Sequence, residues 1–339
     1  MLKPPSYSPN RLSIGFSSGF SLNFLVFALY LRLVQNSLSK VQDKAGLVGW
    51  EAQAQDGMRV RASAGAASFH REPTLEKALA EAQAQVAALE ASSLPNGETP
   101  TLREQAARER AANERVERLE AALKEMPAVE ATKKPDERAK ARVSSTDPQA
   151  RVMKMADGGF RPAYNWEFAT DAANLVIMGV DVVNEGSDKG QMEPMLEQIL
   201  RRYGRLPKTW LEDGGFVKLT ALEQWAERVQ ILAPVPKPRD ETRDPHQPLI
   251  TDSPAIAAWR ERMGTEAAKE TYKLRAASAE CVNAQARTRE GVQQSNVRGQ
   301  AKNRCLALWV AITHNLLVWI RELGATLRPQ PKATMKCAA

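Results

Sequence analysis

The order in which the hydrophobic period changes along the chain constrains its fold more than any other feature. Residues 47–64 alternate apolar and polar side chains, which is typical of a half-buried strand. Residues 164–169 and 175–183 also have strand character, and the turn residues between them predict a β-hairpin. The later segments are predicted as helices over 190–203, 219–229, 254–287 and 306–320, and as strands at 210–211 and 231–235. Strands that alternate with helices in this way predict a mixed α/β domain.

Glycine and apolar side chains refine this prediction. Gly204 is predicted to end the helix over 190–203, and Gly264 to interrupt the helical region 254–287. The proline-rich, charged residues 234–254 are predicted to form a loop. The apolar side chains of the last helix are predicted to pack against the sheet, namely Leu308, Trp309, Ile312, Leu316, Leu317 and Ile320.

Between the first strand and the hairpin, apolar side chains recur every three or four residues. This spacing predicts one helix over 74–91 and a second from Thr101 to Met126-Pro127, with Glu104 completing a capping box. The two helices would form a projecting hairpin with a short apolar seam. A polar, basic linker is predicted at 128–145. A solvated, charged arm without chemistry explains this insertion better than a functional one does.

Three carboxylates occupy positions that suit ligands of a divalent cation. Asp56 lies in the first predicted strand, Asp213 follows the strand at 210–211, and Glu280 lies on a helical segment. Phosphodiester transfer uses two Mg²⁺ ions about 3.5–4 Å apart, and Mg²⁺ prefers hard oxygen ligands. Each carboxylate alone also has an ordinary structural explanation, as a turn, strand or helix-surface residue. The competing carboxylates are Asp147, Asp157, Asp171 and Asp181.

Tyrosine and basic side chains near these carboxylates suit a polyanionic ligand. Tyr272, Arg275 and Arg287 lie along one broad side of the same predicted helix as Glu280, and guanidinium groups bind phosphate through paired hydrogen bonds. Further candidate DNA contacts are Arg161, Arg298, Lys302 and Arg304. Each of these four is nearly as well explained as a solvated surface charge.

Five segments of the chain resemble the DDE transposases of bacterial insertion sequences. The first is 55–64, Gln-Asp-Gly-Met-Arg-Val-Arg-Ala-Ser-Ala, which is similar to the strand that carries their first aspartate. Segments 144–151 and 158–165 resemble the residues that open their second strand, and 212–216, Glu-Asp-Gly-Gly-Phe, resembles their second-aspartate motif. The set Tyr272, Arg275, Glu280 and Arg287 is similar to their Tyr-Arg-Glu-Lys signature. Here the Arg-to-Glu spacing is one residue longer than usual, and arginine takes the last place.

The resemblance covers about residues 45–325 and implies a fold, an activity and a domain plan. It implies an RNase H-like mixed sheet flanked by helices, with the helical hairpin inserted after the first strand. Asp56, Asp213 and Glu280 would bind two Mg²⁺ or Mn²⁺ ions and catalyse cleavage and strand transfer of double-stranded DNA at terminal inverted repeats. A homodimer in a synaptic complex is the implied assembly. The resulting domain plan divides the chain into 45–70, the helical insertion 71–143, the remainder of the catalytic domain 144–325 and a tail 326–339.

Residues 1–44 form an apolar leader that does not match the implied family. Residues 12–31 carry no charge and are long enough to cross a membrane, although serine, glycine and asparagine dilute the first half. We therefore expect a buried or accidental apolar stretch rather than a membrane span. Relatives of this type carry a helical DNA-recognition domain before the first aspartate, so the short leader predicts a truncated or frameshifted copy.

The charge and cysteine content exclude some classes of protein and permit others. The net charge of +7 permits a polyanionic partner. Cys281, Cys305 and Cys337 have no CxxC spacing, which argues against structural zinc and a secreted disulfide framework and favours a reducing cytoplasm. The resemblance to transposases implies association with the nucleoid. Three alternatives stay open: a non-catalytic DNA-binding or helical interaction protein, a membrane-anchored protein, and a different RNase H-like nuclease.

Overall fold

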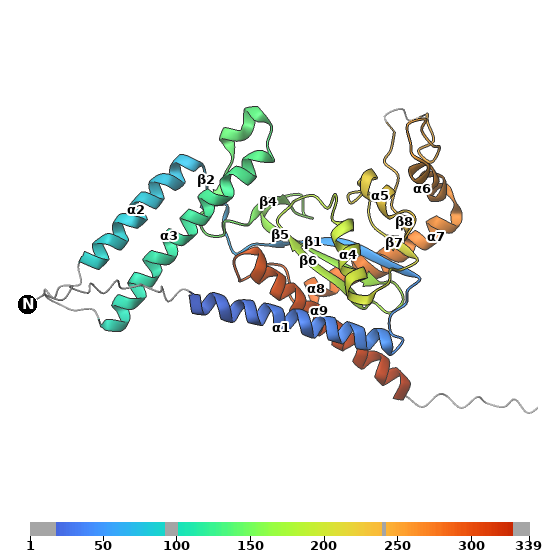
Figure 1. Ribbon diagram of the computed structural model, residues 1–339, viewed down its shortest axis with the longest axis horizontal. Helices are drawn as coiled ribbons and strands as arrows, with labels where there is room; N and C mark the ends of the chain where they lie inside the picture. Colours follow the sequence, from blue (N-terminus) through green and yellow to red (C-terminus); the bar gives the residue numbers. More distant parts are fainter. Residues whose placement is uncertain (1–17, 92–100, 239–241, 328–339) are drawn as a thin grey trace, which may run out of the picture.

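A computed structural model describes residues 18–91, 101–238 and 242–327, and its centre is a mixed β-sheet (Figure 1). The strands of this sheet are β1 (Ala52–Arg61), β4 (Arg151–Lys154), β5 (Phe160–Asp171), β6 (Ile177–Val183), β7 (Thr209–Leu211) and β8 (Gln230–Leu232). The helices around it are α1 (Ser18–Lys44), α2 (Glu72–Ala91), α3 (Leu102–Ala131), α4 (Met192–Tyr203), α5 (Leu219–Trp225), α6 (Pro254–Gly264), α7 (Glu266–Arg275), α8 (Cys281–Thr288) and α9 (Gln300–Leu327). A π-helical turn at Ala276–Glu280 joins α7 to α8.

The strand order places β1 in the middle of the sheet. It pairs antiparallel with β5 on one side and parallel with β7 on the other, and β7 pairs parallel with β8. The far edge of β5 pairs antiparallel with β6 and, through its first residues, with β4. The predictions of a mixed α/β fold and of a β5–β6 hairpin are therefore confirmed. Strand β4 was not predicted, nor was the small second sheet of β2 (Phe69–His70) and β3 (Val143–Ser144).

Large aromatic side chains fill the core on the side of the sheet that faces α8 and α9. Met58 and Val60 of β1 lie opposite Trp166 and Tyr164 of β5, and all four are buried. A second buried cluster includes Trp210, Trp225 and Trp259 and draws on α4, α5 and α6. The prediction that the first strand is half-buried is wrong for its first half, because the alternate side chains Gln53 and Gln55 are also fully buried. A central strand covered on both faces has no solvent side.

The last helix packs on the sheet through only part of the predicted face. Leu308 and Ile312 are buried as predicted, and they belong to the same cluster as Trp166. The other predicted core side chains are 43–64% exposed, namely Trp309, Leu316, Leu317 and Ile320. The prediction was wrong for these four because they lie on the exposed side of α9, whereas Leu308, Ile312 and Val318 lie on the side that packs.

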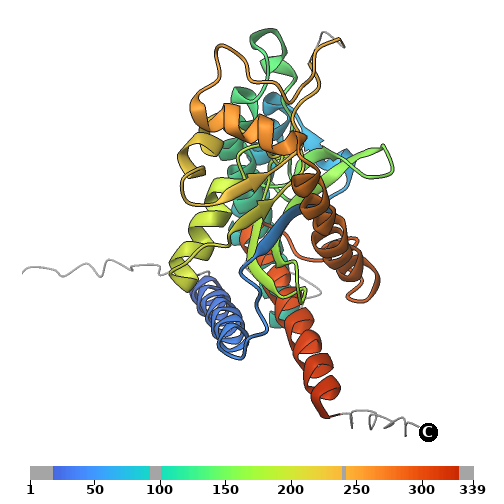
Figure 2. The same ribbon diagram turned by 90° about the vertical axis from the view of Figure 1, so that its right-hand side faces the viewer.

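Helix α1 covers the predicted apolar leader from Ser18 onward and packs against α9 on the same side of the sheet (Figure 2). Leu31 is 1% exposed. Two buried glutamines of α1 form hydrogen bonds with the backbone of β6 and α9. Gln35 Nε2 donates to the carbonyl oxygen of Ile177 at 3.1 Å, and Gln42 Nε2 donates to that of Asn315 at 2.7 Å. The described part of the leader is therefore attached to the fold, and residues 1–17 lie outside the described residues.

One helix within the described ranges has the length and apolar composition to cross a membrane. It is the segment Gln300–Gly324 of α9, of which 44% is buried inside the protein. A core helix of a soluble domain passes the same test, so this is weak evidence for a membrane span.

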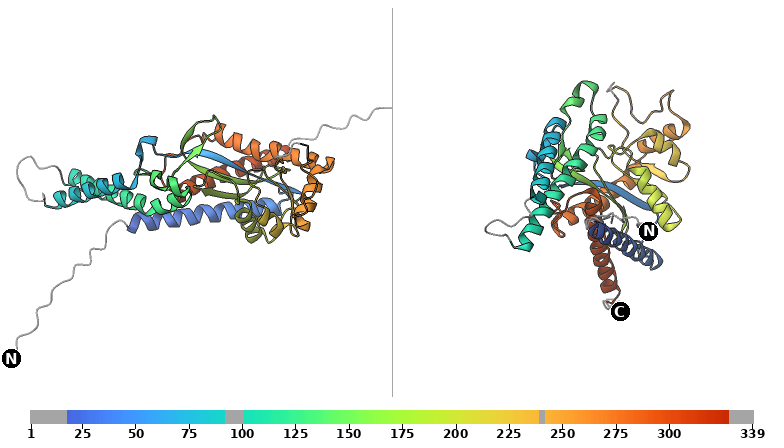
Figure 3. Two further views of the ribbon diagram at one scale, coloured as in Figure 1. Left: turned by 90° about the horizontal axis from the view of Figure 1, so that it is seen from above. Right: turned by 60° about the vertical axis from the view of Figure 1, so that its left-hand side comes forward.

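Helices α2 and α3 form the predicted hairpin, which projects beyond the end of the sheet (Figures 1 and 3). The predicted capping box is confirmed: Glu104 N donates to Thr101 Oγ1 at 3.3 Å, and Thr101 N to Glu104 Oε2 at 2.9 Å. The predicted end at Pro127 is wrong, because α3 continues to Ala131. Met126 and Val129 are buried against α2 and β3, and this packing offsets the backbone hydrogen bond that a proline removes.

Other element ends follow the predictions in part. Gly204 ends α4 with a φ of 71°, a left-handed conformation that glycine adopts at little cost, and this confirms its predicted role. Helix α5 ends at Trp225 rather than at 229. The predicted linker 128–145 contains a 3₁₀ helix at Pro135–Lys140 and strand β3. The break predicted at 92–97 and the tail from 328 onward lie outside the described residues.

Replacing Asp171 with asparagine is expected to flatten the dependence of stability on pH. Burial raises the pKa of the Asp171 carboxyl to about 6, although its Oδ2 accepts a hydrogen bond from Asn174 N. Between pH about 4 and 6 the unfolded chain releases this proton and the folded chain retains it. The free energy of unfolding therefore falls as the pH rises through that window, by up to about 3 kcal/mol. Urea midpoints measured from pH 4 to 7 test this, and an unchanged slope in Asp171→Asn contradicts it.

Candidate active site

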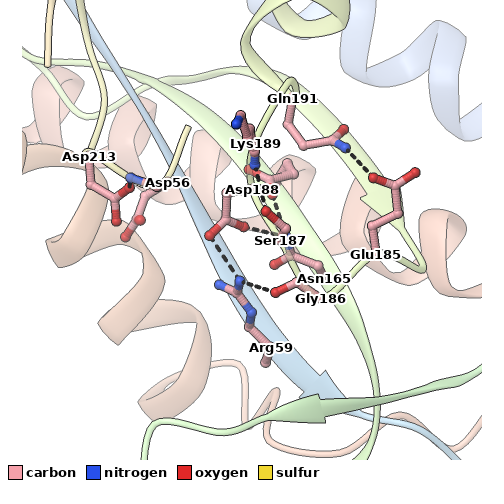
Figure 4. Close-up of polar contacts among 12 residues, drawn as sticks. Asp56, Arg59, Asn165, Glu185, Gly186, Ser187, Asp188, Lys189, Gln191 and Asp213 are labelled. Carbon is pink, nitrogen blue, oxygen red and sulfur yellow. Dashed lines mark hydrogen bonds and ion pairs between the residues drawn. The ribbon is translucent and has the colours of Figure 1, made fainter. Parts of the chain in front are cut away.

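Asp56 and Asp213 lie next to each other because their strands are parallel neighbours in register. Ala54 of β1 pairs with Leu211, the last residue of β7. Asp56 lies two residues further along β1, and Asp213 lies two residues beyond Leu211, in the loop after β7. Side chains two residues apart point to the same face of a sheet. Figure 4 shows the two carboxylates next to each other, with Asp56 on β1 and Asp213 on the segment beside it.

Arg275 brings the third predicted carboxylate to the first two. Its Nη2 lies 3.1 Å from Asp56 Oδ1 and 3.7 Å from Asp213 Oδ2, and its Nη1 lies 2.7 Å from Glu280 Oε1. The arginine side chain is only 12% exposed. One guanidinium therefore contacts carboxylates from the middle of the sheet, from the loop after β7 and from the helix that covers them.

Asp56 is the most enclosed of the three carboxylates. Its side chain is 17% exposed, whereas those of Asp213 and Glu280 are 41% and 52% exposed. Burial raises the pKa of Asp56, Arg275 and a hydrogen bond from Asn283 lower it, and the negative charges of Asp213 and Glu280 raise it again. Asn283 Nδ2 donates to Asp56 Oδ2 at 2.9 Å. Asn283 was not predicted from the sequence, although it lies three residues after Glu280 on the same helical segment.

The carboxyl beside Asp213 is buried, whereas that of Asp213 is 41% exposed. Glu212 is 1% exposed, and burial, followed by the negative charge of Asp213, raises its pKa to about 8. Glu212 is therefore protonated at neutral pH. Of these two neighbouring residues, Asp213 is the one whose carboxyl lies beside Arg275, at 3.7 Å, and is open to a ligand.

The other residues of the predicted helical signature differ in their distance from the site. Tyr272 is half-buried near the three carboxylates, and burial raises the pKa of its hydroxyl. Arg287 lies on α8 and makes no ion pair with Asp56, Asp213 or Glu280. The structure thus brings Tyr272 and Arg275 to the carboxylates, but not Arg287.

The remaining candidate DNA contacts lie away from the carboxylates. Arg161 Nη1 donates to Asp157 Oδ1 at 2.8 Å, at the exposed turn between β4 and β5. Arg304 pairs with Asp181 of β6. Arg298 and Lys302 are exposed at the amino end of α9. Their predicted role in binding DNA stays a prediction.

The competing carboxylates have structural partners of their own. Asp147 is fully buried and accepts hydrogen bonds from Tyr164 Oη at 2.7 Å and from Gly299 N at 3.1 Å. Asp171 caps the turn after β5. Asp157 and Asp181 pair with Arg161 and Arg304. The ion pairs of Arg275 are with Asp56, Asp213 and Glu280, not with any of these four carboxylates.

A second polar network lies across the sheet from Asp56 and was missed in the sequence (Figure 4). Asn165 Nδ2 donates to Glu167 Oε1 and to Asp188 Oδ1, both at 2.6 Å. Arg59 Nη2 donates to Asp188 Oδ2 at 2.9 Å. Burial, and then the negative charge of Asp188, raises the pKa of Glu167 well above its usual range. The alternation of Asn165 and Glu167 on one strand was the available signal, but their partner on the loop before α4 is not evident from local sequence.

The helical part of the site falls within a segment that matches a known family. Residues 244–319 match the family model described as Transposase DDE domain. The match supports a DDE transposase and includes Tyr272, Arg275 and Glu280, but it covers less than a quarter of the chain and neither aspartate. A comparison with curated proteins gave no match.

The donor atoms at this transposase-like site suit a hard divalent cation, but their spacing is set by Arg275. Carboxylate oxygens are the ligands that Mg²⁺ and Mn²⁺ prefer. Within 18–91, 101–238 and 242–327, no group of three or more His, Cys, Asp or Glu side chains is arranged to hold a metal ion. The three carboxylates instead surround a guanidinium, which supplies the positive charge. Their chemistry therefore fits a cation that takes the place of this group.

Proposed function

We propose that this protein is a DDE transposase that cleaves and joins DNA at the ends of an insertion sequence, with Asp56, Asp213 and Glu280 as its catalytic residues. The observation that carries the proposal is the convergence of these three carboxylates on Arg275. The match of 244–319 to a transposase DDE domain supports it independently, because that segment supplies both Glu280 and Arg275.

The strand arrangement supports an RNase H-like fold for the catalytic domain. The order across the sheet is β6-β5-β1-β7-β8, and β5 alone runs against the other four. The two aspartates lie on the central strand and just beyond its parallel neighbour, and the glutamate comes from a later helix. This is the placement that the sequence resemblance implies for the three residues.

Asp56, Asp213 and Glu280 would hold the divalent cations, which supply electrostatic stabilisation of the attacking and leaving oxygens in phosphodiester transfer. Arg275 lies among the same carboxylates, and its positive charge lowers the pKa of Asp56 against the effect of the two neighbouring negative charges, which raise it. Its guanidinium has donors that also fit a phosphate. Buried Asn283 holds the orientation of the Asp56 carboxylate.

The proposed substrate is double-stranded DNA with terminal inverted repeats, bound by two copies of the chain. The net charge of +7 and the exposed Arg298 and Lys302 at one end of α9 support a polyanionic partner. A surplus of this size attracts phosphate without reading base sequence. Recognition of the repeats therefore needs contacts in the grooves, in addition to this charge.

The test is a strand-transfer assay with the full chain, Mn²⁺ or Mg²⁺, and labelled duplexes that carry the terminal repeats of a neighbouring element. We expect nicking and joined products that disappear when EDTA removes the metal. Cleavage without joining points instead to a different RNase H-like nuclease. The same duplexes with scrambled ends serve as the control for end recognition.

A non-catalytic DNA-binding or interaction protein is the second candidate. The observation that favours it is the guanidinium among the carboxylates, together with the lack of a metal-ligating group in the described parts of the chain. Retarded migration of DNA with no product in any divalent metal would support this candidate.

A further inference from the structure

We propose that the π-helical turn at Ala276–Glu280 is a positioning element that rotates Glu280 onto the face of the helix occupied by Arg275. The role of this turn in catalysis rests on the proposed function, whereas the rotation of Glu280 does not. The turn holds one residue more than an α-helical path between the same two ends. The extra residue is what brings the glutamate, rather than a neighbour, to Asp56 and Asp213.

The contact between Arg275 and Glu280 requires such a turn. An α-helix has 3.6 residues per turn, so side chains five residues apart point about 140° away from each other around the axis. Yet Arg275 Nη1 lies 2.7 Å from Glu280 Oε1. In a π-helical turn, where the backbone bonds span five residues, positions five apart lie on the same face, as positions four apart do in an α-helix. The ion pair between Arg275 and Glu280 is therefore evidence for the wider turn.

Packing fixes both ends of the helical segment. Neither end can therefore turn about the helix axis to undo the rotation of Glu280. Before the turn, Ala268 is buried in the cluster that contains Trp210 and Trp259. After it, Val282 and Ala286 are buried in the cluster that contains Trp166. Asn283 also binds Asp56. Because both ends of the segment are anchored, the additional residue is accommodated between them, in the π-helical turn.

The turn is held by a buried side chain. Ser278 is fully buried, and its Oγ donates to the carbonyl oxygen of Leu274 at 2.6 Å and lies 3.4 Å from that of Arg275. These carbonyls lie where the α-helical pattern of hydrogen bonds is interrupted. A serine hydroxyl that binds a carbonyl four residues earlier is a recognised accompaniment of local helix distortion. Ala276 and Ala277 are exposed, which leaves room for the wider backbone.

The test compares two deletions of one exposed alanine each. Deleting Ala277 removes the extra residue, so the segment becomes an α-helix whose two ends keep their rotation and in which arginine and glutamate are four apart, still neighbours. Deleting Ala284 from α8, where there is no extra residue, rotates the following side chains by about 100°. We expect the Tm of the Ala277 deletion to stay within about 4 °C of wild type and that of the Ala284 deletion to fall by more than about 8 °C.

The second readout is Mn²⁺ affinity with and without Glu280→Gln. We expect this substitution to weaken Mn²⁺ binding by about tenfold or more, both in the full chain and in the Ala277 deletion. Equal loss of Tm in the two deletions overturns the inference. So does a folded Ala277 deletion in which Glu280→Gln no longer affects Mn²⁺ binding. If the wild-type protein binds no Mn²⁺, the proposed function fails, and the Tm comparison still decides the rotation.

Discussion

Replacing Asp213 with asparagine is expected to lower metal-dependent DNA cleavage by at least about a hundredfold while the fold is retained. Asp213 is 41% exposed and lies in a loop, so the substitution removes little packing. Its Oδ1 accepts a hydrogen bond from Gly215 N at 2.6 Å, and asparagine can keep that bond. What is lost is one of the three negative charges around Arg275. Initial rates of cleavage over a range of Mn²⁺ concentrations measure the effect.

The matched control is Asp157→Asn, the same substitution at an exposed aspartate. Asp157 pairs with Arg161 at the β4–β5 turn, away from the three carboxylates. Its replacement should leave the rate within about twofold, because an exposed ion pair contributes little. Cleavage by Asp213→Asn at the rate of this control would remove Asp213 from the catalytic site.

Replacing Gly57 with alanine is expected to lower the free energy of unfolding by about 2–4 kcal/mol. A Cβ at this position would lie 2.6 Å from Asp188 Oδ1 and 2.9 Å from both Asn165 Oδ1 and Glu167 Oε1. No real Cβ approaches oxygen so closely, so the buried network must move. Glu167 would then lose hydrogen bonds in a place that water does not reach, which is costly. Urea denaturation measures the change.

Gly65→Ala is the control for Gly57→Ala. No atom lies within 4 Å of the position that its Cβ would occupy, and its φ of −87° suits any residue. This variant should be as stable as wild type, or more stable by about 0.4–1 kcal/mol, because alanine restricts the unfolded chain. If the free energy of unfolding of Gly57→Ala equals that of Gly65→Ala, the network around Gly57 accommodates the added methyl group and the prediction is wrong.

The sequence predicts those parts of the fold that depend on neighbours along the chain. The hairpin of β5 and β6, the capping box at Thr101 and the glycine stop at Gly204 are all local, and all are confirmed. Strand β4 was missed because it exists only through its pairing with β5. The exposure of Trp309 was missed because α9 carries apolar side chains around much of its circumference, so periodicity does not show which side packs on the sheet.

In the candidate site too, what depends on distant contacts could not be predicted from the sequence. That Asp56 and Asp213 lie together was expected only from the resemblance, since the sequence itself does not show that β1 and β7 are parallel neighbours. The rotation of Glu280 could not be predicted, because an α-helix is the default expectation and the π-helical turn depends on packing at both of its ends. Asp188 and Asn283 were missed for a related reason, since each is recognised only by the distant residue it contacts.

The position of Arg275 affects how a ligand would bind. Its guanidinium ties together a strand, a loop and a helix that lie more than 200 residues apart at the extremes. The acidic groups are thus already gathered before any cation or nucleic acid arrives, and binding need not order these segments. Little conformational entropy is lost in such an exchange, so affinity depends mainly on how readily one positive charge replaces another.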